Sequence, residues 1–234
     1  NYEDGWDAYD ARLIFEEQES SGYRKKEVDQ LPLWNSEELP KDVPVLILPE
    51  QGVGDEVMFA SLIDEFVAAR DAKTIVVCSP RLVSLFRRSF KNVHVTTQFD
   101  LVVTADYYRL FMGSLPRILR RKIQTFVPAK AYLEIDPDKV TFFENRYSNR
   151  PALKVGVSWK SGNPTEGIKR SIPLQIFNGI LEKNACTFFN LQYGDCVAEI
   201  ALFKQETGIE IINDNLLDPM TDLDTFFAFV KTLD

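Results

Sequence analysis

Short apolar runs alternate with amphipathic segments through the first half of the chain. The predicted strands are residues 43–48, 74–78, 93–96 and 101–103. The predicted helices are residues 55–70, 80–90 and 113–121. Strand and helix follow one another at the spacing of βαβ crossovers, so the pattern predicts a parallel sheet in an α/β fold.

The same alternation restarts in the second half of the chain, after a polar stretch at 134–153 that we interpret as an interdomain connection. The predicted strands of this second unit are residues 154–159, 187–191 and 209–212. Its predicted helices are residues 172–182, 195–207 and 222–233. A doubly wound domain normally has more strands, so the far half of the second unit is expected to be missing.

Residues 1–34 follow a different pattern. Trp6, Tyr9, Leu13 and Phe15 have the spacing of one short amphipathic helix, which is typical of the end of a helical-repeat region or of a helix that docks on the next domain. The segment Leu31-Pro32-Leu33-Trp34 is predicted to be a linker. The expected division of the chain is a helical segment and linker at 1–34, an N-terminal Rossmann-like domain at 35–140 and a C-terminal Rossmann-like domain at 141–234.

Composition and charge narrow the class of protein. The chain has 234 residues, of which 45% are hydrophobic and 26% charged, and its net charge is −8, which argues against nonspecific nucleic-acid binding. No apolar run reaches membrane-spanning length and no signal-peptide pattern is present, so a cytoplasmic location is expected. Cys78, Cys186 and Cys196 are scattered and are interpreted as reduced thiols. With His94 as the single histidine, triads and His-rich metal sites are nearly excluded.

The loop after the first predicted strand is the strongest candidate for a binding site. It places Gly52, Gly54 and Asp55 between a buried strand and a helix, where ligands of open α/β sheets bind. Glycines let backbone N–H groups approach a ligand, and a helix N-terminus favours negative charge. Asp55 fits two roles, an N-cap and a functional carboxylate, and the spacing alone favours the N-cap. The pattern matches neither a dinucleotide-binding nor a P-loop motif.

The loop after the first strand of the second unit, at 159–171, carries cations and hydroxyls. Lys160, Lys169 and Arg170 surround the N-terminus of the helix predicted from residue 172, a combination that suits a diphosphate. A solvated loop with Ser171 as the N-cap explains the pattern about as well. Two other acidic sites, Asp195 and the pair Asp222 and Asp224, are interpreted as helix caps, and the pair as caps strongly over a metal site.

These loops also resemble a known family. Glu50-Gln51-Gly52-Val53-Gly54-Asp55 is similar to the Glu-Gln-Gly-x-Gly-Asp signature of glycosyltransferases attached to tetratricopeptide repeats. Those enzymes resemble the bacterial ADP-heptose:lipopolysaccharide heptosyltransferases of glycosyltransferase family 9. The other matching segments are residues 5–12, 113–116, 131–133, 155–159, 162–164, 170–174 and 190–192. Together they cover nearly the whole chain.

The resemblance implies a GT-B fold, in which two Rossmann-like domains face a cleft, and a transfer that needs no metal or other cofactor. The implied partners are a nucleotide-diphosphate sugar as donor and a glycan or protein hydroxyl as acceptor, with Asp55 as the general base. The cleft loop would contain Glu50, Gln51, Gly52 and Gly54. The expected donor-binding residues are Trp159, Lys160, Ser161, Gly162, Asn163, Lys169, Arg170, Ser171 and Gln192.

The chain departs from the family in one respect. The family's later Asp-Thr-x-x-x-His-Leu-Ala-Gly loop, which closes the donor site, is absent. This departure keeps a second hypothesis open, a non-catalytic scaffold or binding module that retains the fold. A nucleotide-binding oxidoreductase is a third hypothesis, weakened by the lack of a glycine fingerprint.

Overall fold

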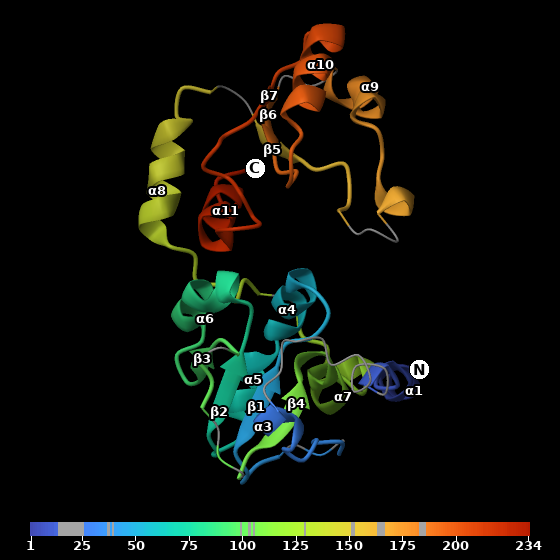
Figure 1. The fold of residues 1–234 in the computed structure, drawn as a ribbon, viewed down its shortest axis with the longest axis vertical. Helices are drawn as coiled ribbons and strands as arrows, with labels where there is room; N and C mark the ends of the chain where they lie inside the picture. The colour runs from blue at the N-terminus through green and yellow to red at the C-terminus, as the bar shows by residue number, and fades with distance from the viewer. Residues whose placement is uncertain are drawn as a thin grey trace. The chain divides into compact units, whose positions relative to one another are not determined.

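The protein forms two compact units, Asn1–Glu134 and Ile135–Asp234, each with a parallel sheet of its own (Figure 1). The computed structural model describes residues 1–13, 26–36, 38, 40–98, 100–102, 104, 106–128, 130–150, 153–162, 167–182 and 186–234. Both units are mixed α/β and Rossmann-like, as the alternation of strands and helices predicts.

The first unit is built on a four-stranded parallel sheet. Its strands are β1 (Val45–Leu48), β2 (Thr74–Val77), β3 (His94–Thr96) and β4 (Tyr108–Phe111), in the order β3-β2-β1-β4. Every residue of β1 and β2 is buried, which explains why all of them except Thr74 are apolar. This strand order matches the first four strands of a doubly wound fold.

The fourth strand corrects the sequence analysis. Leu101 and Val102 lie outside any strand, so the strand predicted at 101–103 is wrong; Val103 lies outside the described residues. β4 was missed because the charged Arg109 stands in its middle. Arg109 is nevertheless buried, and its Nε donates to the Leu31 carbonyl oxygen at 3.0 Å.

Helices and 3-10 turns connect and flank these strands. They are α1 (Tyr2–Tyr9), α3 (Lys26–Asp29), α4 (Val53–Ala60), α5 (Ile63–Ala68), η1 (Pro80–Leu82), α6 (Val83–Ser89), η2 (Met112–Ser114), α7 (Leu115–Leu119) and η3 (Ile123–Thr125). The single helix predicted at 55–70 is wrong, because α4 and α5 are separated at Ser61 and Leu62. The Ser61 hydroxyl donates to the Met58 carbonyl oxygen at 2.7 Å, a local bond that competes with continuation of the helix.

The N-terminal segment packs into the first unit, so the structure does not separate 1–34 from it. Val28 and Leu31 are buried in one cluster with Leu46 of β1, and Leu33 forms a parallel bridge to Arg109 of β4. Figure 1 shows α1 beside α7, and these two helices are in contact. The predicted linker therefore contributes to the core; Phe15 lies outside the described residues.

The second unit has helices on both faces of a three-stranded parallel sheet. The strands are β5 (Lys154–Val157), β6 (Thr187–Asn190) and β7 (Ile211–Ile212), in the order β5-β6-β7. Because neighbouring residues of a strand point to opposite faces, Phe188 and Phe189 belong to two different buried clusters. The Phe188 cluster includes residues of α9 (Asn178–Leu181) and α10 (Val197–Thr207), and the Phe189 cluster includes residues of α8 (Pro137–Arg146) and α11 (Leu223–Val230).

α8 occupies half of the stretch at 134–153, so this stretch is not a plain connection, although the two compact units do divide at its start. The Asp136 carboxylate caps its first turn, and Pro137 occupies the first helical position, where proline is tolerated. Phe143 packs against Phe229 of α11 with ring centroids 5.3 Å apart, and Figure 1 shows the two helices alongside each other. The boundary of the two compact units therefore lies before α8, at Glu134, rather than at residue 140.

The helix predicted at 172–182 is also wrong in its first half. In its place is the 3-10 helix η5 (Leu174–Phe177), followed by the short helix α9; another 3-10 helix, η4 (Ile168–Arg170), lies before residue 172. The cap predicted for α11 is confirmed, because the Asp222 carboxylate accepts from the Thr225 N–H at 3.0 Å. None of the helices in the described ranges combines the length and the apolar character needed to cross a membrane.

Candidate functional site

The loop between β1 and α4 lies at the carboxyl end of a central strand of the first sheet. Gly52 is the N-cap residue of α4, and its N–H donates to the Asp55 carboxylate at 3.1 Å. Asp55 therefore stabilises the helix start from the third helical position, not from the N-cap that the sequence analysis considered. Asp55 is only partly buried.

The backbone of this loop is open and unusual. A Cβ atom at Gly54 would have no heavy atom within 4 Å, so the space beside that residue is open. Gln51 has a φ of 59°, in the left-handed region that residues with a side chain rarely adopt. Residues in such conformations cluster at binding and catalytic sites, where surrounding contacts hold them in place.

Glu50, expected in the cleft loop, points into the protein. Its side chain is 1% exposed, and one carboxylate oxygen accepts from the Gly113 N–H at 2.5 Å. Arg12 donates to both carboxylate oxygens of Glu50, through Nε at 2.8 Å and Nη2 at 2.7 Å. A Cβ at residue 113 would lie 2.1 Å from Glu50 Oε1, so only glycine fits there.

Arg12 is the centre of this contact between the N-terminal segment and the loop. Its guanidinium also donates to the Tyr9 carbonyl oxygen at 3.0 Å, the Asp10 carboxylate at 2.7 Å and the Ser114 hydroxyl at 3.1 Å. Burial disfavours the charge, but the hydrogen bonds and charges of Glu50 and Asp10 prevail and raise the pKa of Arg12. The pair is a bidentate ion pair of the kind that fixes geometry as well as charge.

The arginines near α7 are paired with acids of the same unit. Arg117 and Arg121 both contact the Asp7 carboxylate at 3.0 Å, and Arg120 forms a fork with Glu65. These pairs tie α7 to α1 and α5. The positive charge near α7 is therefore largely neutralised within the protein.

Glu56, which the sequence analysis missed, lies directly after Asp55 and is buried. Its carboxylate accepts from the Ser79 N–H at 2.8 Å, which links α4 to the end of β2. Burial raises the pKa of Glu56. The only sequence signal for this link is the position of Glu56, an acid in the first turn of a helix beside a neighbouring strand.

The second candidate loop follows β5 and is held by Gln192. The Gln192 side-chain oxygen accepts from the Ser158 hydroxyl at 3.1 Å and from the N–H groups of Trp159 and Lys160 at 3.1 and 2.9 Å. Gln192 is buried, and its amide group donates to the Tyr193 carbonyl oxygen. The observed role of Gln192 is thus to fix the loop, and contact with a donor stays a prediction.

Glu199 of α10 binds the first part of this loop. It accepts from the indole N–H of Trp159 at 2.9 Å and from Lys160 Nζ at 2.7 Å. Trp159 is buried and Lys160 is ion-paired, so the charge of Lys160 is already balanced. The Ser161 N–H donates to the Ser171 hydroxyl at 3.0 Å, which closes the described ends of the loop on each other.

The remaining expected donor-binding residues differ in their surroundings. The Gly162 N–H donates to the Tyr193 hydroxyl, and a Cβ at Gly162 would lie 2.7 Å from that ring. Lys169 and Arg170 are exposed on η4, and Asn163 lies outside the described residues. Because no α-helix begins at residue 172, the predicted contribution of a helix dipole to diphosphate binding is missing here.

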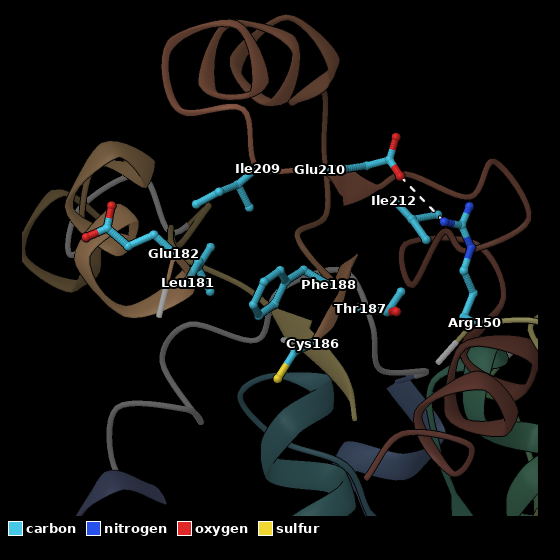
Figure 2. Close-up of a pocket in the computed structure, with 9 residues that line it drawn as sticks. All are labelled: Arg150, Leu181, Glu182, Cys186, Thr187, Phe188, Ile209, Glu210 and Ile212. Carbon is cyan, nitrogen blue, oxygen red and sulfur yellow. Dashed lines mark ion pairs between the residues drawn. The ribbon is translucent and has the colours of Figure 1, made fainter. Parts of the chain in front are cut away.

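A pocket of about 280 Å³ in the second unit lies at a different edge of the sheet (Figure 2). Figure 2 shows the Arg150–Glu210 ion pair on one side of the pocket and Glu182 on the other, with Phe188 between them. Phe188 is near the start of β6 and Glu210 precedes β7, so the pocket is close to the amino ends of these strands. Ligands of open α/β sheets bind at the carboxyl ends instead.

Comparisons with known proteins give two partial likenesses. The chain is 31% identical to protein FlbA of Caulobacter vibrioides over 252 residues, which cover 99% of this chain but only 41% of FlbA. The solved structure of the bacterial iron-containing dodecameric glycosyltransferase TibC from enterotoxigenic E. coli H10407 matches with a TM-score of 0.46 and 14% identity, over 70% of this chain and 45% of TibC. No protein-family model matches the chain. At this coverage and similarity neither likeness assigns the chain to a family.

Proposed function

We propose that the chain is part of a nucleotide-sugar glycosyltransferase, which moves a sugar from a nucleotide-diphosphate donor to a hydroxyl of a glycan or protein. The observation that carries the proposal is Asp55, a partly exposed carboxylate in an open glycine turn at the carboxyl end of a buried parallel strand. Ligands bind at that edge of open α/β sheets. The resemblance of residues 50–55 to the glycosyltransferase signature supports the same role.

In the proposed reaction, Asp55 accepts the proton of the acceptor hydroxyl as that oxygen bonds to the anomeric carbon of the donor sugar. The bond between this carbon and the diphosphate oxygen breaks, and the nucleoside diphosphate leaves with the electron pair. A general base of this kind contributes on the order of 10²–10⁴ in rate.

The leaving diphosphate needs positive charge and N–H donors, because the resemblance implies that no metal supplies them. Lys169 and Arg170 are exposed cations in the loop after β5. We assign the donor diphosphate to this loop. A GT-B arrangement belongs to the proposal, since the base and the donor loop must meet across one cleft.

A non-catalytic binding or scaffold module is the second candidate, and one contact favours it. Because the Gly52 N–H donates to Asp55, helix capping alone explains an acid at this position. The two candidates differ in what Asp55 does when an acceptor is bound.

Replacing Asp55 by asparagine tests both candidates. Asparagine can still accept from the Gly52 N–H, so Asp55→Asn should lower the free energy of unfolding by only about 0.3–1 kcal/mol through the lost charge at the helix start. If Asp55 is the base, sugar transfer should fall about 10²-fold or more while nucleotide-diphosphate binding is unchanged.

Asp64→Asn is the matched control, because Asp64 is an exposed acid in the first turn of the next helix, α5. Transfer should be normal in this variant. Normal transfer in Asp55→Asn as well would remove Asp55 from the mechanism, and the absence of nucleotide-diphosphate binding by the unmodified chain would favour the scaffold.

A further inference from the structure

Two residues of the N-terminal segment hold the loop that carries Asp55. Tyr9 lies at the end of α1, and Arg12 follows three residues later. Their partners, Gln51 and Glu50, are next to each other in the loop between β1 and α4. About 40 residues of chain separate the two sides of these contacts, so they are tertiary and not local.

The loop needs such support because Gln51 adopts the left-handed conformation, with φ at 59°. A non-glycine residue in this region is strained and persists only where neighbouring contacts hold it. The Gln51 side-chain amide donates to the Tyr9 hydroxyl at 3.1 Å. Glu50, on the preceding residue, is fixed by the two N–H donors of Arg12 and by the Gly113 N–H.

Tyr9 and Arg12 also fix each other. The Arg12 guanidinium lies 4.1 Å from the centroid of the Tyr9 ring, within cation–π distance. The Tyr9 ring also lies 6.2 Å from the ring of Phe59, which is buried on α4. One pair of side chains thus contacts the loop at residues 50 and 51 and the helix that follows it.

We propose that Tyr9 and Arg12 are positioning residues for Asp55: through Gln51 and Glu50 they set the backbone of the turn from which the Asp55 carboxylate projects. The helical segment at the N-terminus therefore controls the acceptor side of the site. This inference rests on the proposed function of Asp55 for its catalytic consequence, whereas its structural part, the dependence of the loop on residues 9 and 12, stands without it.

The test uses two conservative variants of the full chain. Arg12→Lys keeps the positive charge but loses the fork that binds both oxygens of Glu50, and Tyr9→Phe removes only the hydroxyl that accepts from Gln51. Two variants serve as matched controls. Arg121→Lys alters an ion pair with Asp7 of α1, the helix that ends at Tyr9. Tyr2→Phe retains its ring beside Phe126.

The first readout is amide hydrogen exchange across residues 49–56, which needs no activity. Exchange should become about 10-fold faster or more in Arg12→Lys, less so in Tyr9→Phe, and should stay unchanged in both controls, because only the first two variants loosen the loop. Circular dichroism and thermal melting check that all four variants are folded. Unchanged exchange in both folded test variants would overturn the inference.

The second readout separates kcat from KM in sugar transfer. In Arg12→Lys, kcat should fall about 10-fold or more because the base is misplaced, while the KM for the donor should not change, since the donor loop has its contacts in the second unit. If the loop loosens in Arg12→Lys but the unmodified chain transfers no sugar, the proposed function fails and the structural coupling stands. If the chain transfers sugar and kcat in Arg12→Lys and Tyr9→Phe equals that of the controls, the positioning role fails and the proposed function stands.

Discussion

The loops that follow β1 and β5 differ in what holds them. The loop after β1 is fixed from outside, by Arg12 of the N-terminal segment and by the Gly113 N–H after β4, and it continues into the regular helix α4. The loop after β5 is fixed from within its own sheet, by Gln192 at the end of β6, and continues into irregular 3-10 turns. Similar sequence patterns therefore produce a turn with an acid that distant residues hold, and a loop with cations that residues of its own unit hold.

The loops after β1 and β5 also differ in the charged side chains around them. The cations of the first loop's surroundings, such as Arg12 and Arg117, are bound to acids of the same unit. In the second loop, Lys160 is paired with Glu199. Lys169 and Arg170 lie at the surface of the same loop. The first loop is suited to hold one carboxylate in a defined place, and the second has positive charge at its surface for an anion.

Removing Arg12 should have the largest effect on stability. Arg12→Ala leaves the Glu50 carboxylate, which is 1% exposed, without its charge partner, and breaking a buried ion pair in this way costs about 3–5 kcal/mol. The measurement is urea unfolding followed by circular dichroism. The matched control is Lys91→Ala, whose partner Glu134 and whose own side chain are more than half exposed, with an expected cost of at most about 1 kcal/mol. Equal costs would mean that Arg12 does not brace the first loop.

Gln192→Ala should destabilise the second unit by a smaller amount, about 2–3 kcal/mol. The substitution removes the only side-chain acceptor that the described residues provide for the N–H groups of Trp159 and Lys160, and an unsatisfied buried donor costs about 1–3 kcal/mol. Gln205→Ala, at an exposed position of α10, is the control and should change stability by less than about 0.5 kcal/mol. If unfolding shows no difference between the two variants, Gln192 does not hold the loop, and a purely donor-binding role gains support.

The sequence predicts the central strands of both units well, for a physical reason. A strand buried on both faces is apolar at nearly every position, as β1 and β2 are apart from Thr74. β4 and α8 do not show such an apolar pattern. Arg109 interrupts the apolar sequence of β4 with a charge that the fold neutralises. On α8, only Phe143 is fully buried. Local pattern cannot reveal an element whose polar residues find their partners far along the chain.

Local sequence pattern is limited in the same way at the candidate site. The turn with Gly52, Gly54 and Asp55 is visible in the sequence because its constraints are local. The contact of Arg12 with Glu50 spans 38 residues, and nothing in the spacing of either residue indicates it. The sequence therefore predicts Glu50 in the cleft loop, whereas tertiary packing turns its side chain inward.

The pH dependence of stability should report on Glu56. Burial raises the pKa of this carboxyl group in the folded protein above its ordinary value of 4.5, so the native state binds the proton more tightly than the unfolded state. The stability contributed by the protonated group is present below about pH 4.5 and is lost as pH rises through the folded-state pKa. Glu56→Gln keeps an oxygen for the Ser79 N–H and does not ionise.

The free energy of unfolding of Glu56→Gln should therefore increase relative to that of the unmodified chain as pH rises from about 4.5 towards neutrality. The variant becomes relatively more stable. The effect should be smaller than those of Arg12→Ala and Gln192→Ala, because the hydrogen bond is retained. Urea unfolding at a series of pH values measures it. A relative stability that does not vary with pH would mean that Glu56 ionises as freely in the folded chain as in the unfolded one.

The variant with the smallest expected effect on stability, Gly54→Ala, tests most directly whether a ligand approaches the backbone of the first loop. A Cβ added at Gly54 meets nothing within 4 Å, and the residue is helical, so Gly54→Ala should raise the free energy of unfolding by about 0.5–1 kcal/mol. Gly5→Ala in α1 is the matched control, because a Cβ there also meets no atom within 4 Å and the gain should be similar. If a ligand approaches the backbone of the turn, Gly54→Ala should lose affinity or turnover despite its added stability, while Gly5→Ala should keep both. If both variants gain stability with unchanged binding and transfer, no ligand approaches Gly54, and the open space beside the turn has no part in the site.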